Sequence, residues 1–571
     1  MDDEAKYRYN KRTLNFLQLY MKSFKKSFPY FLIAGILLNA NGLLNDILEP
    51  DGALYATISK HIALTGEWFN LYGDGHDWLD KPHFPFWIAA FSFKLLGITA
   101  FAYKLPAFVF WLVGIRFIFK LTDKLYDTIT ANAAVLIYIF SLHGILNNFD
   151  VRAEPYLTTL IIAAIYYFYK SIVSEKWLDI ILTALMAACA IMTKGIFALI
   201  TIGGGFVIYW IISKQWKQFV NYRWWVMLLL ILLFITPELY GLYVQFDLHP
   251  EKVVFGRTNV SGLRFFFWDS QFGRFFNTGP IKGHGDPAFF LHTTLWAFLP
   301  WSVILYIAAV QLIRNKNEKF DSRRWIVYGS AGITFIMFSF SRFQLPFYIV
   351  IIFTHFSIIT AAYLTSLHTE STFKKLAVLQ NSLLIIAGLF VCALAFYSHF
   401  GNVILIASIS TGVIIVNFFF AKKAGITRII MSGWAFSYVL FLFLHNFFYP
   451  QLLTYQSGMK AGKWLLSNKK YKTPAMFRSS SYSFEFYAPG YIQRLETFTD
   501  MDKFLEEDNN RAIYASDSNL QELKLQGYQY NLLANFSDFH ISMLTPKFLK
   551  PATRKGELRK MVLITVRKKM Q

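Results

Sequence analysis

The sequence predicts an α-helical polytopic membrane protein with a small C-terminal external α/β domain. Three observations lead to this prediction. The 571-residue chain is 55% hydrophobic and 16% charged, whereas a soluble domain has about a quarter of its residues charged. Its apolar runs approach the ~20 residues that a helix needs to cross a bilayer. From residue 451 onward the chain becomes polar, with short strand-like segments.

The membrane part contains about thirteen apolar runs that we expect to be transmembrane helices. These runs are residues 31–48, 105–119, 130–146, 156–169, 178–192, 196–212, 224–243, 288–313, 325–340, 345–364, 376–398, 403–420 and 429–448. The sequence therefore predicts a transmembrane domain over 1–450, with long external loops at 49–104 and 245–287. Loops of this length are usually functional.

Charge sets the expected orientation. The formal net charge is +21, and basic residues recur in alternate short loops, as at Lys120, Lys170 and Lys214. Such loops face the cytoplasm. We expect a multi-pass protein of the bacterial inner (plasma) membrane, with a cytoplasmic N-terminus and a periplasmic C-terminal domain. The excess charge fits membrane lipids better than nucleic acid, since no basic aromatic module is visible.

The tail, residues 451–571, predicts a soluble external α/β domain. The segments AMFRSSSYSFEFYA (475–488), RAIYASD (511–517) and KMVLITV (560–566) predict strands, and DMDKFLEEDN (500–509) predicts a helix. In the first long loop, LYATISKHIAL (54–64) is amphipathic and suited to lying flat on the membrane interface.

Acidic residues follow the first apolar run directly. In DILEPDGALYA, Glu49 and Asp51 lie at the expected external face. A carboxylate in such a place could take a proton from an acceptor hydroxyl. The alternative is an ordinary pair of interfacial acids in water. We take Asp51 and Glu49 as candidate catalytic residues, with Tyr55 in the same segment as a candidate for substrate binding.

Cations form a second candidate set. In DWLDKPHFPFW, Lys81 and His83 lie among aromatic rings and prolines that predict a stiff turn. Lys81 could bind a substrate phosphate or extend to lipid head groups. His83 could equally be a packing residue. The segment FDVRAEPY adds Arg152 and Glu154 as further candidates for substrate binding. The alternative is that these two residues form a self-satisfied ion pair.

Further cations lie at later external connections. Lys194 lies in MTKGI, and SRFQLPFY holds Arg342. The second long loop interleaves arginines with aromatics and glycines, and includes Arg274 and His284. Planar arginines suit a phosphate, and aromatic faces suit sugar rings or isoprenyl tails. The alternative is a surface for anionic lipid. Cations and at least one acid on one face fit an anionic, lipid-linked substrate that enters from the bilayer.

The motifs resemble the GT-C glycosyltransferases, in the branch of ArnT and the protein O-mannosyltransferases. The resemblance rests on EPDGALYATISKHIALTGEW and WLDKPHFPFWIAAFSFKLLGITAFAYKLPA in the first loop. TKG at 193–195, the FF-L region after His284, PW at 300–301 and LPFY at 345–348 follow in the expected order. It covers residues 30–450.

The resemblance implies transfer of a sugar from a polyprenyl-phosphate donor to a lipid, glycan or protein acceptor at the external face. It implies that Asp51 acts on the acceptor and that Lys81 contacts the donor phosphate, and it aligns Lys194 with the lysine of the family's TKG element. This chain departs from the family at two places. Gly52 replaces a frequent glutamate, and Gln344 replaces a frequent lysine, with Arg342 as a potential substitute.

Two chemical questions remain open at this stage. One well-placed base suits inversion at the anomeric carbon, because retention would need a nucleophile as well. No metal-binding cluster is evident, although aspartate and histidine near the site leave room for a divalent metal ion.

A transporter of polyprenyl-linked glycolipid or polysaccharide is one alternative function, and a non-catalytic glycolipid-binding membrane scaffold is another.

Overall fold

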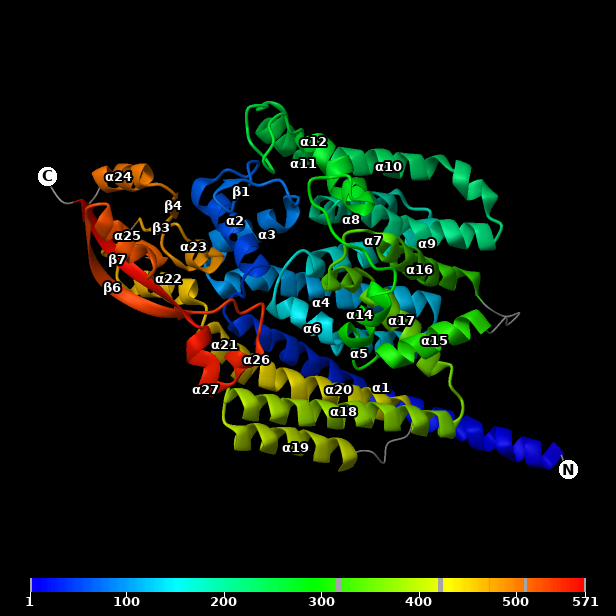
Figure 1. Ribbon diagram of the computed structural model, residues 1–571. Helices are drawn as coiled ribbons and strands as arrows, with labels where there is room; N and C mark the ends of the chain where they lie inside the picture. Colours follow the sequence, from blue (N-terminus) through cyan, green and yellow to red (C-terminus); the bar gives the residue numbers. More distant parts are fainter. Residues whose placement is uncertain (1–2, 315–320, 420–424, 472, 508–510, 569–571) are drawn as a thin grey trace.

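The computed structural model describes residues 3–314, 321–419, 425–471, 473–507 and 511–568. Long helices form a bundle, and the C-terminal domain lies at the end of this bundle opposite the N-terminus (Figure 1). The helices in the first part are α1 (Asp3–Asn41), α2 (Asp51–Thr65), α3 (Phe84–Leu96), α4 (Ala100–Leu125), α5 (Thr128–Ile139), α6 (Leu142–Phe149), α7 (Glu154–Ser174), α8 (Trp177–Lys194), α9 (Ala198–Ile212), α10 (Tyr222–Phe234) and α11 (Thr236–Leu242).

The second part of the bundle is again helical. Its helices are α12 (Gly262–Arg264), α13 (Arg274–Phe276), α14 (Phe289–Ala297), α15 (Ser302–Arg314), α16 (Trp325–Phe340), α17 (Phe353–Thr365), α18 (Glu370–Ser398), α19 (Val403–Phe419), α20 (Ile426–Phe443) and α21 (Tyr449–Leu453). Two π-helical turns, η3 (Tyr243–Asp247) and η4 (Phe265–Gly273), and a 3₁₀ segment, η6 (Pro346–Ile352), complete the part that surrounds the site.

Helix lengths support a polytopic membrane protein. Seven described helices are long and apolar enough to cross a membrane, or nine if each of two bent pairs is one span. Helices suit this role because they satisfy their own backbone hydrogen bonds where water is absent. The expected number of about thirteen spans stays a prediction, because four further apolar helices have only 10–17 residues.

Side chains fix the starts of α4 and α5 and the segment that follows α1. The Thr99 side chain accepts from the backbone N–H of Ala102 at the start of α4, and Asp127 does the same for α5. The Nζ of Lys104 in α4 is buried and donates to the carbonyls of Gly42 and Asn45 at 3.2 and 2.9 Å. Lys104 therefore fixes the segment that leads from α1 to Asp51.

The two long loops are ordered rather than extended. The first contains α2, a short hairpin of β1 (Tyr72–Gly73) and β2 (His76–Asp77), and α3. Most of α2 is buried by protein, and its apolar residues pack against α3 and the C-terminal domain. The expectation that residues 54–64 lie flat on the membrane interface stays a prediction.

The C-terminal domain is built on a five-stranded sheet in the order β4-β3-β5-β7-β6. Its strands are β3 (Ala475–Phe477), β4 (Gln493–Leu495), β5 (Ala512–Ser516), β6 (Tyr528–Asp538) and β7 (Arg559–Lys568), and its helices are α22 (Ser457–Ser467), α23 (Tyr482–Tyr487), α24 (Phe498–Glu507), α25 (Asn519–Leu525), α26 (Pro546–Leu549) and α27 (Pro551–Arg554). The first three strands of the order are parallel, and β7 is antiparallel to both neighbours. Alternate residues of the sheet supply two apolar clusters.

The segments expected in the tail are only partly as predicted. Strands β5 and β7 and helix α24 lie where the sequence places them. Of residues 475–488, only the first three form a strand, and Tyr482–Tyr487 form α23. Ser481 caps this helix by accepting from the N–H of Phe484, and a local cap of this kind overrides the strand propensity of aromatic residues.

Charges of the first loop hold α23 at both ends. Glu49 Oε1 accepts from Ser481 Oγ at 2.9 Å and from the N–H of Ser483 at 2.5 Å. The Nζ of Lys60 donates to the carbonyls of Glu485 and Ala488, both at 2.6 Å. An acid at the N-terminus and a cation at the C-terminus complement the helix dipole. These contacts attach the C-terminal domain to α2.

Candidate functional site

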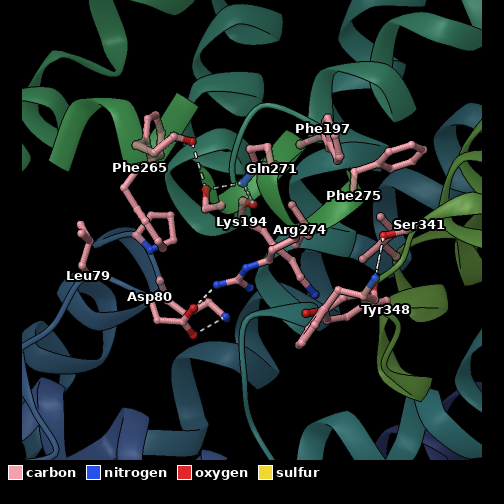
Figure 2. Close-up of a pocket in the computed structure, with 18 of the residues that line it drawn as sticks. Leu79, Asp80, Lys194, Phe197, Phe265, Gln271, Arg274, Phe275, Ser341 and Tyr348 are labelled. Carbon is pink, nitrogen blue, oxygen red and sulfur yellow. Dashed lines mark hydrogen bonds and ion pairs between the residues drawn. The ribbon is translucent and has the colours of Figure 1, made fainter. Parts of the chain in front are cut away.

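A large cavity lies between the first and second long loops. Its volume is about 970 Å³ including the open mouth, within the ~300–1,000 Å³ typical of ligand pockets. The walls are mostly apolar and include Leu157, Phe265 and Phe338, whereas polar groups gather in one part of the lining. Figure 2 shows these groups converging from separate elements, with Asp80 and Arg274 joined.

Three cations line this cavity: Lys81, Lys194 and Arg274. Lys81 Nζ lies 2.6 Å from Asp80 Oδ2, and Arg274 Nη2 donates to the other oxygen of Asp80. Lys194 is paired with Glu154, which is buried at the start of α7. Three cations thus share two carboxylate partners, Asp80 and Glu154, while a further carboxylate of the lining, Glu238, is paired with His83. An anionic group is the ligand that this balance favours.

The loop charges influence one another strongly. Burial would raise the pKa of Asp80, but Lys81 and Arg274 outweigh it and lower that pKa to about 2. Burial lowers the pKa of Lys81; Asp80 opposes this effect and Arg274 adds to it. The Nε of Arg274 is buried and has no hydrogen-bond partner among the described residues. Arg274 therefore has a donor available for a ligand in the cavity.

Glycine at position 195 brings the second loop onto α8. Gly195 has φ +99°, and a Cβ there would lie 2.1 Å from Gln271 Nε2 of η4. Gln271 Nε2 also donates to the carbonyl of Lys194 at 3.3 Å. Only glycine fits this backbone and this approach, so the TKG motif sets how η4 and Arg274 meet Lys194.

A second cluster surrounds Asp51 at the start of α2. Arg152 Nη1 donates to Asp51 Oδ2 at 2.6 Å, and Arg152 Nη2 donates to Asp150 Oδ2 at 2.6 Å. The Asp51 side chain is 41% exposed. Partial desolvation raises the pKa of Asp51, and Arg152 opposes this effect. Asp51 Oδ1 makes no hydrogen bond to any residue that the structure describes.

Phe347 connects the two clusters. The guanidinium of Arg152 lies 4.5 Å from the centre of the Phe347 ring, and Lys194 Nζ lies 5.5 Å from it. Lys194 Nζ also lies 4.0 Å from the centre of the Tyr348 ring. Lys81 is one of the charges that act on Asp51. The cluster at Asp51 and the cation-lined cavity are therefore neighbours, joined through the Phe347 ring.

Comparisons with known proteins place this fold. Residues 80–240 match the family described as dolichyl-phosphate-mannose-protein mannosyltransferase. The crystal structure of ArnT from Cupriavidus metallidurans bound to undecaprenyl phosphate superposes with a TM-score of 0.73, over 94% of this chain and 97% of that one, at 15% identity. The chain therefore has the ArnT fold, and part of its sequence is similar to the mannosyltransferase family, as the resemblance to the GT-C branch of ArnT and the protein mannosyltransferases predicts.

The curated relatives of this chain are distant. An uncharacterized protein of Aquifex aeolicus is 24% identical over 66% of this chain and 70% of its own length. The undecaprenyl phosphate-alpha-4-amino-4-deoxy-L-arabinose arabinosyl transferase of Shewanella sediminis is 25% identical over 56% of each chain. The chain thus spans only a little over half the length of the arabinosyl transferases that it matches.

Most of the predicted site residues lie together in the two clusters. Asp51, Lys81, Arg152, Glu154, Lys194 and Arg274 all belong to the two clusters. Tyr55 is buried one turn after Asp51, with its ring 5.2 Å from that of Phe86, and the charges of Asp80, Glu154 and Asp51 all act on its hydroxyl. The roles assigned to these residues stay predictions.

Four predicted residues lie elsewhere. Glu49 contacts α23, as described above. His83 is buried, and its N–H and Nδ1 both contact Glu238, each at 3.0 Å. His284 and Arg342 are exposed and do not line the cavity. Their environments favour structural roles for Glu49 and His83 over contact with a ligand.

Sequence reasoning gave no role to three residues that shape the site. Asp80 directly precedes Lys81, and its adjacency was the available signal. Asp150 lies two residues before Arg152 in FDVRAEPY, and this spacing indicates no more than a local ion pair. Tyr348 ends the LPFY motif, and no pattern in the sequence indicates that its ring faces Lys194. Among the residues that the structure describes, no three His, Cys, Asp or Glu side chains form a group that could hold a metal ion.

Proposed function

We propose that the protein is a glycosyltransferase that moves a hexosyl or pentosyl group from a polyprenyl-phosphate donor to a lipid, glycan or protein acceptor at the external face. One observation carries the proposal: three cations line an apolar cavity, and one of them, Lys194, contacts the same Phe347 ring as Arg152, which binds Asp51. A polyprenyl phosphate combines an anionic head with an apolar tail, and this cavity offers both environments. The solved ArnT was crystallised with undecaprenyl phosphate, which makes such a ligand the first to test.

The chemistry follows from the charges. The acceptor oxygen forms a bond to the anomeric carbon while the bond from that carbon to the phosphate oxygen breaks. Asp51 takes the acceptor proton, and Arg152 holds Asp51 Oδ2 so that Oδ1 faces the acceptor. The electron pair leaves with polyprenyl phosphate, whose charge Lys81, Lys194 and Arg274 stabilise. Direct displacement of this kind inverts the anomeric centre.

The test uses purified full-length protein with a polyprenyl-phosphate sugar. Acceptor-dependent release of polyprenyl phosphate is measured for the wild type, Asp51→Asn and Asp517→Asn. The Asp517 control is matched, because its side chain is 40% exposed and pairs with a lysine, whereas that of Asp51 is 41% exposed and pairs with an arginine. Loss of a general base costs about 100-fold or more in rate, so Asp51→Asn should nearly abolish release and Asp517→Asn should not.

Other outcomes would favour the alternatives. Full release by Asp51→Asn would remove the role of this residue as base. Vesicle-to-vesicle movement of intact donor without release would indicate a transporter, and tight donor binding without either would indicate a scaffold. The orientation of the termini is part of this proposal, because the clusters and the C-terminal domain must face the side where the acceptor lies. Accessibility labelling of a cysteine placed at Tyr491 in intact cells would test that side.

A further inference from the structure

A second pocket lies where the first loop meets the C-terminal domain. Its walls come from the end of α2, the hairpin of β1 and β2, and the segment between α23 and β4, which lie side by side (Figure 1). It is smaller than the main cavity, about 400 Å³ including open space. The lining includes His61, Tyr72, Glu485 and Tyr491.

Aromatic rings form one wall of this pocket. The ring of His61 lies 5.3 Å from that of Tyr72 and 5.8 Å from that of Tyr491, measured between ring centres. Tyr491 is 52% exposed, although its ring joins this cluster. An exposed aromatic face beside a recess offers a flat apolar surface to a ligand.

Lys60, Asp74 and Glu485 form the other wall, and Arg494 pairs with both of these carboxylates from outside the lining. Arg494 Nε donates to Glu485 Oε1 at 2.8 Å, and Arg494 Nη1 donates to Asp74 at 2.8 Å. Glu485 is 93% buried, with 7% exposure. Its Oε2 and the Nη2 of Arg494 have no hydrogen-bond partner among the described residues. A buried carboxylate oxygen without a partner is costly, so a ligand that donates to it would bind favourably.

The geometry points to a saccharide site, and we infer that this pocket binds a neutral sugar ring of the acceptor. Tyr491 would stack on the ring, while a hydroxyl would donate to Glu485 Oε2, whose other oxygen is held by Arg494. Among the lining groups and Arg494, the cations Lys60 and Arg494 balance the carboxylates of Asp74 and Glu485, which favours a neutral ligand over a phosphate. Few polar groups beside aromatic walls are typical of small-ligand pockets.

The position of the pocket suits an extended acceptor. Ten residues of α2 separate His61 from Asp51, which corresponds to about 15 Å at ~1.5 Å per residue. An acceptor glycan could therefore occupy this pocket while another of its hydroxyls reaches Asp51. Naming the ligand as part of the acceptor rests on the proposed function, but binding in the pocket does not require transfer.

Binding can therefore be tested without turnover. Short neutral hexose and N-acetylhexosamine oligosaccharides are titrated into the full-length protein in detergent by calorimetry. We expect Tyr491→Ala and Glu485→Gln each to weaken binding about tenfold, equivalent to about 1.4 kcal/mol. Tyr530→Ala, a change of the same type on β6 of the same domain, should leave binding unchanged. Asp51→Asn should also bind as the wild type does.

The outcomes separate this inference from the proposed function. Saccharide binding that depends on Tyr491 but occurs without any transfer activity would support the pocket and count against the enzyme. Absence of binding by the wild type at millimolar oligosaccharide would overturn the inference, as would equal binding by the wild type, Tyr491→Ala and Glu485→Gln. Tyr491 is on the surface, so its truncation should not prevent folding. The circular dichroism and thermal unfolding of each variant are compared with those of the wild type.

Discussion

Replacing Arg274 with glutamine removes one cation from the main cavity and keeps most of the side-chain length. In the structure Arg274 is 13% exposed and pairs with Asp80, while its Nε has no partner among the described residues. Asp80 remains paired with Lys81 after the change. The variant should therefore fold, and its main defect should be weaker binding of an anionic ligand.

The size of the defect follows from the charges. With Arg274 absent, Lys81 and Lys194 each have one carboxylate partner, Asp80 and Glu154, and no additional cation remains for a ligand. A hydrogen bond to a charged group contributes about 1.5–3 kcal/mol, and every 1.4 kcal/mol is about tenfold in affinity. Arg274→Gln should thus weaken the binding of polyprenyl phosphate by about 10- to 100-fold. In the wild type, Arg274 already pairs with Asp80, so only part of its charge acts on a ligand. We therefore expect a loss of affinity near tenfold.

Binding of undecaprenyl phosphate in detergent is the direct assay, with Arg264→Gln as the matched control. Arg264 lies ten residues earlier on the same segment, but its side chain is 74% exposed and outside the cavity lining. A surface change of this kind alters free energy by about 0.5 kcal/mol or less. Equal affinities for the wild type and Arg274→Gln, or equal losses for both variants, would refute the assignment of a phosphate site to this cavity.

Three further changes test the neighbouring contacts. Arg152→Gln should move the acidic limb of the pH–rate profile to higher pH, because Arg152 lowers a pKa of Asp51 that burial has raised; a limb that stays in place or moves down would contradict Asp51 as base. Glu49→Gln should lower the stability of the C-terminal domain by about 1–3 kcal/mol and speed proteolysis near α23, whereas lost transfer with unchanged stability would make Glu49 catalytic. Gly52→Ala should slow transfer, because the Cβ of the alanine would lie 2.9 Å from Asp150 Oδ1. This effect is expected although alanine favours a helix over glycine by about 1 kcal/mol. Full activity of the variant would mean that the position of Asp150 is unimportant.

Much of the fold and the centre of the site could be predicted because charge is rare in this chain. An acid or cation beside a membrane-length apolar run is costly unless it is paired or solvated. Asp51, Lys81, Arg152 and Lys194 stand out for that reason, and the structure brings them together. The same rule cannot tell which partner each charge will find, since pairing depends on residues that are distant in sequence.

Glu49 illustrates what the sequence cannot supply. It precedes Asp51 by two residues, yet its carboxylate contacts Ser481 and Ser483, more than 400 residues later. The segment 475–488 looks like a strand, so the helix that offers those N–H groups was not predicted. His83 is similar, because its buried partner Glu238 lies 155 residues away. The position of a charged residue in a loop indicates that its side chain is available for a contact. Tertiary contacts decide which way that side chain points.

The departure at Gly52 can also be explained by tertiary structure. A glutamate there would need a Cβ 2.9 Å from Asp150 Oδ1, so this chain has room either for that glutamate or for Asp150 in its present place. Asp150 approaches Arg152 from the loop before α7 and shares it with Asp51. A second acid is therefore present beside Asp51, but it comes from a different segment. The negative charge beside Asp51 is retained although the local sequence pattern is lost, which is why the missing glutamate does not by itself argue for a non-catalytic scaffold.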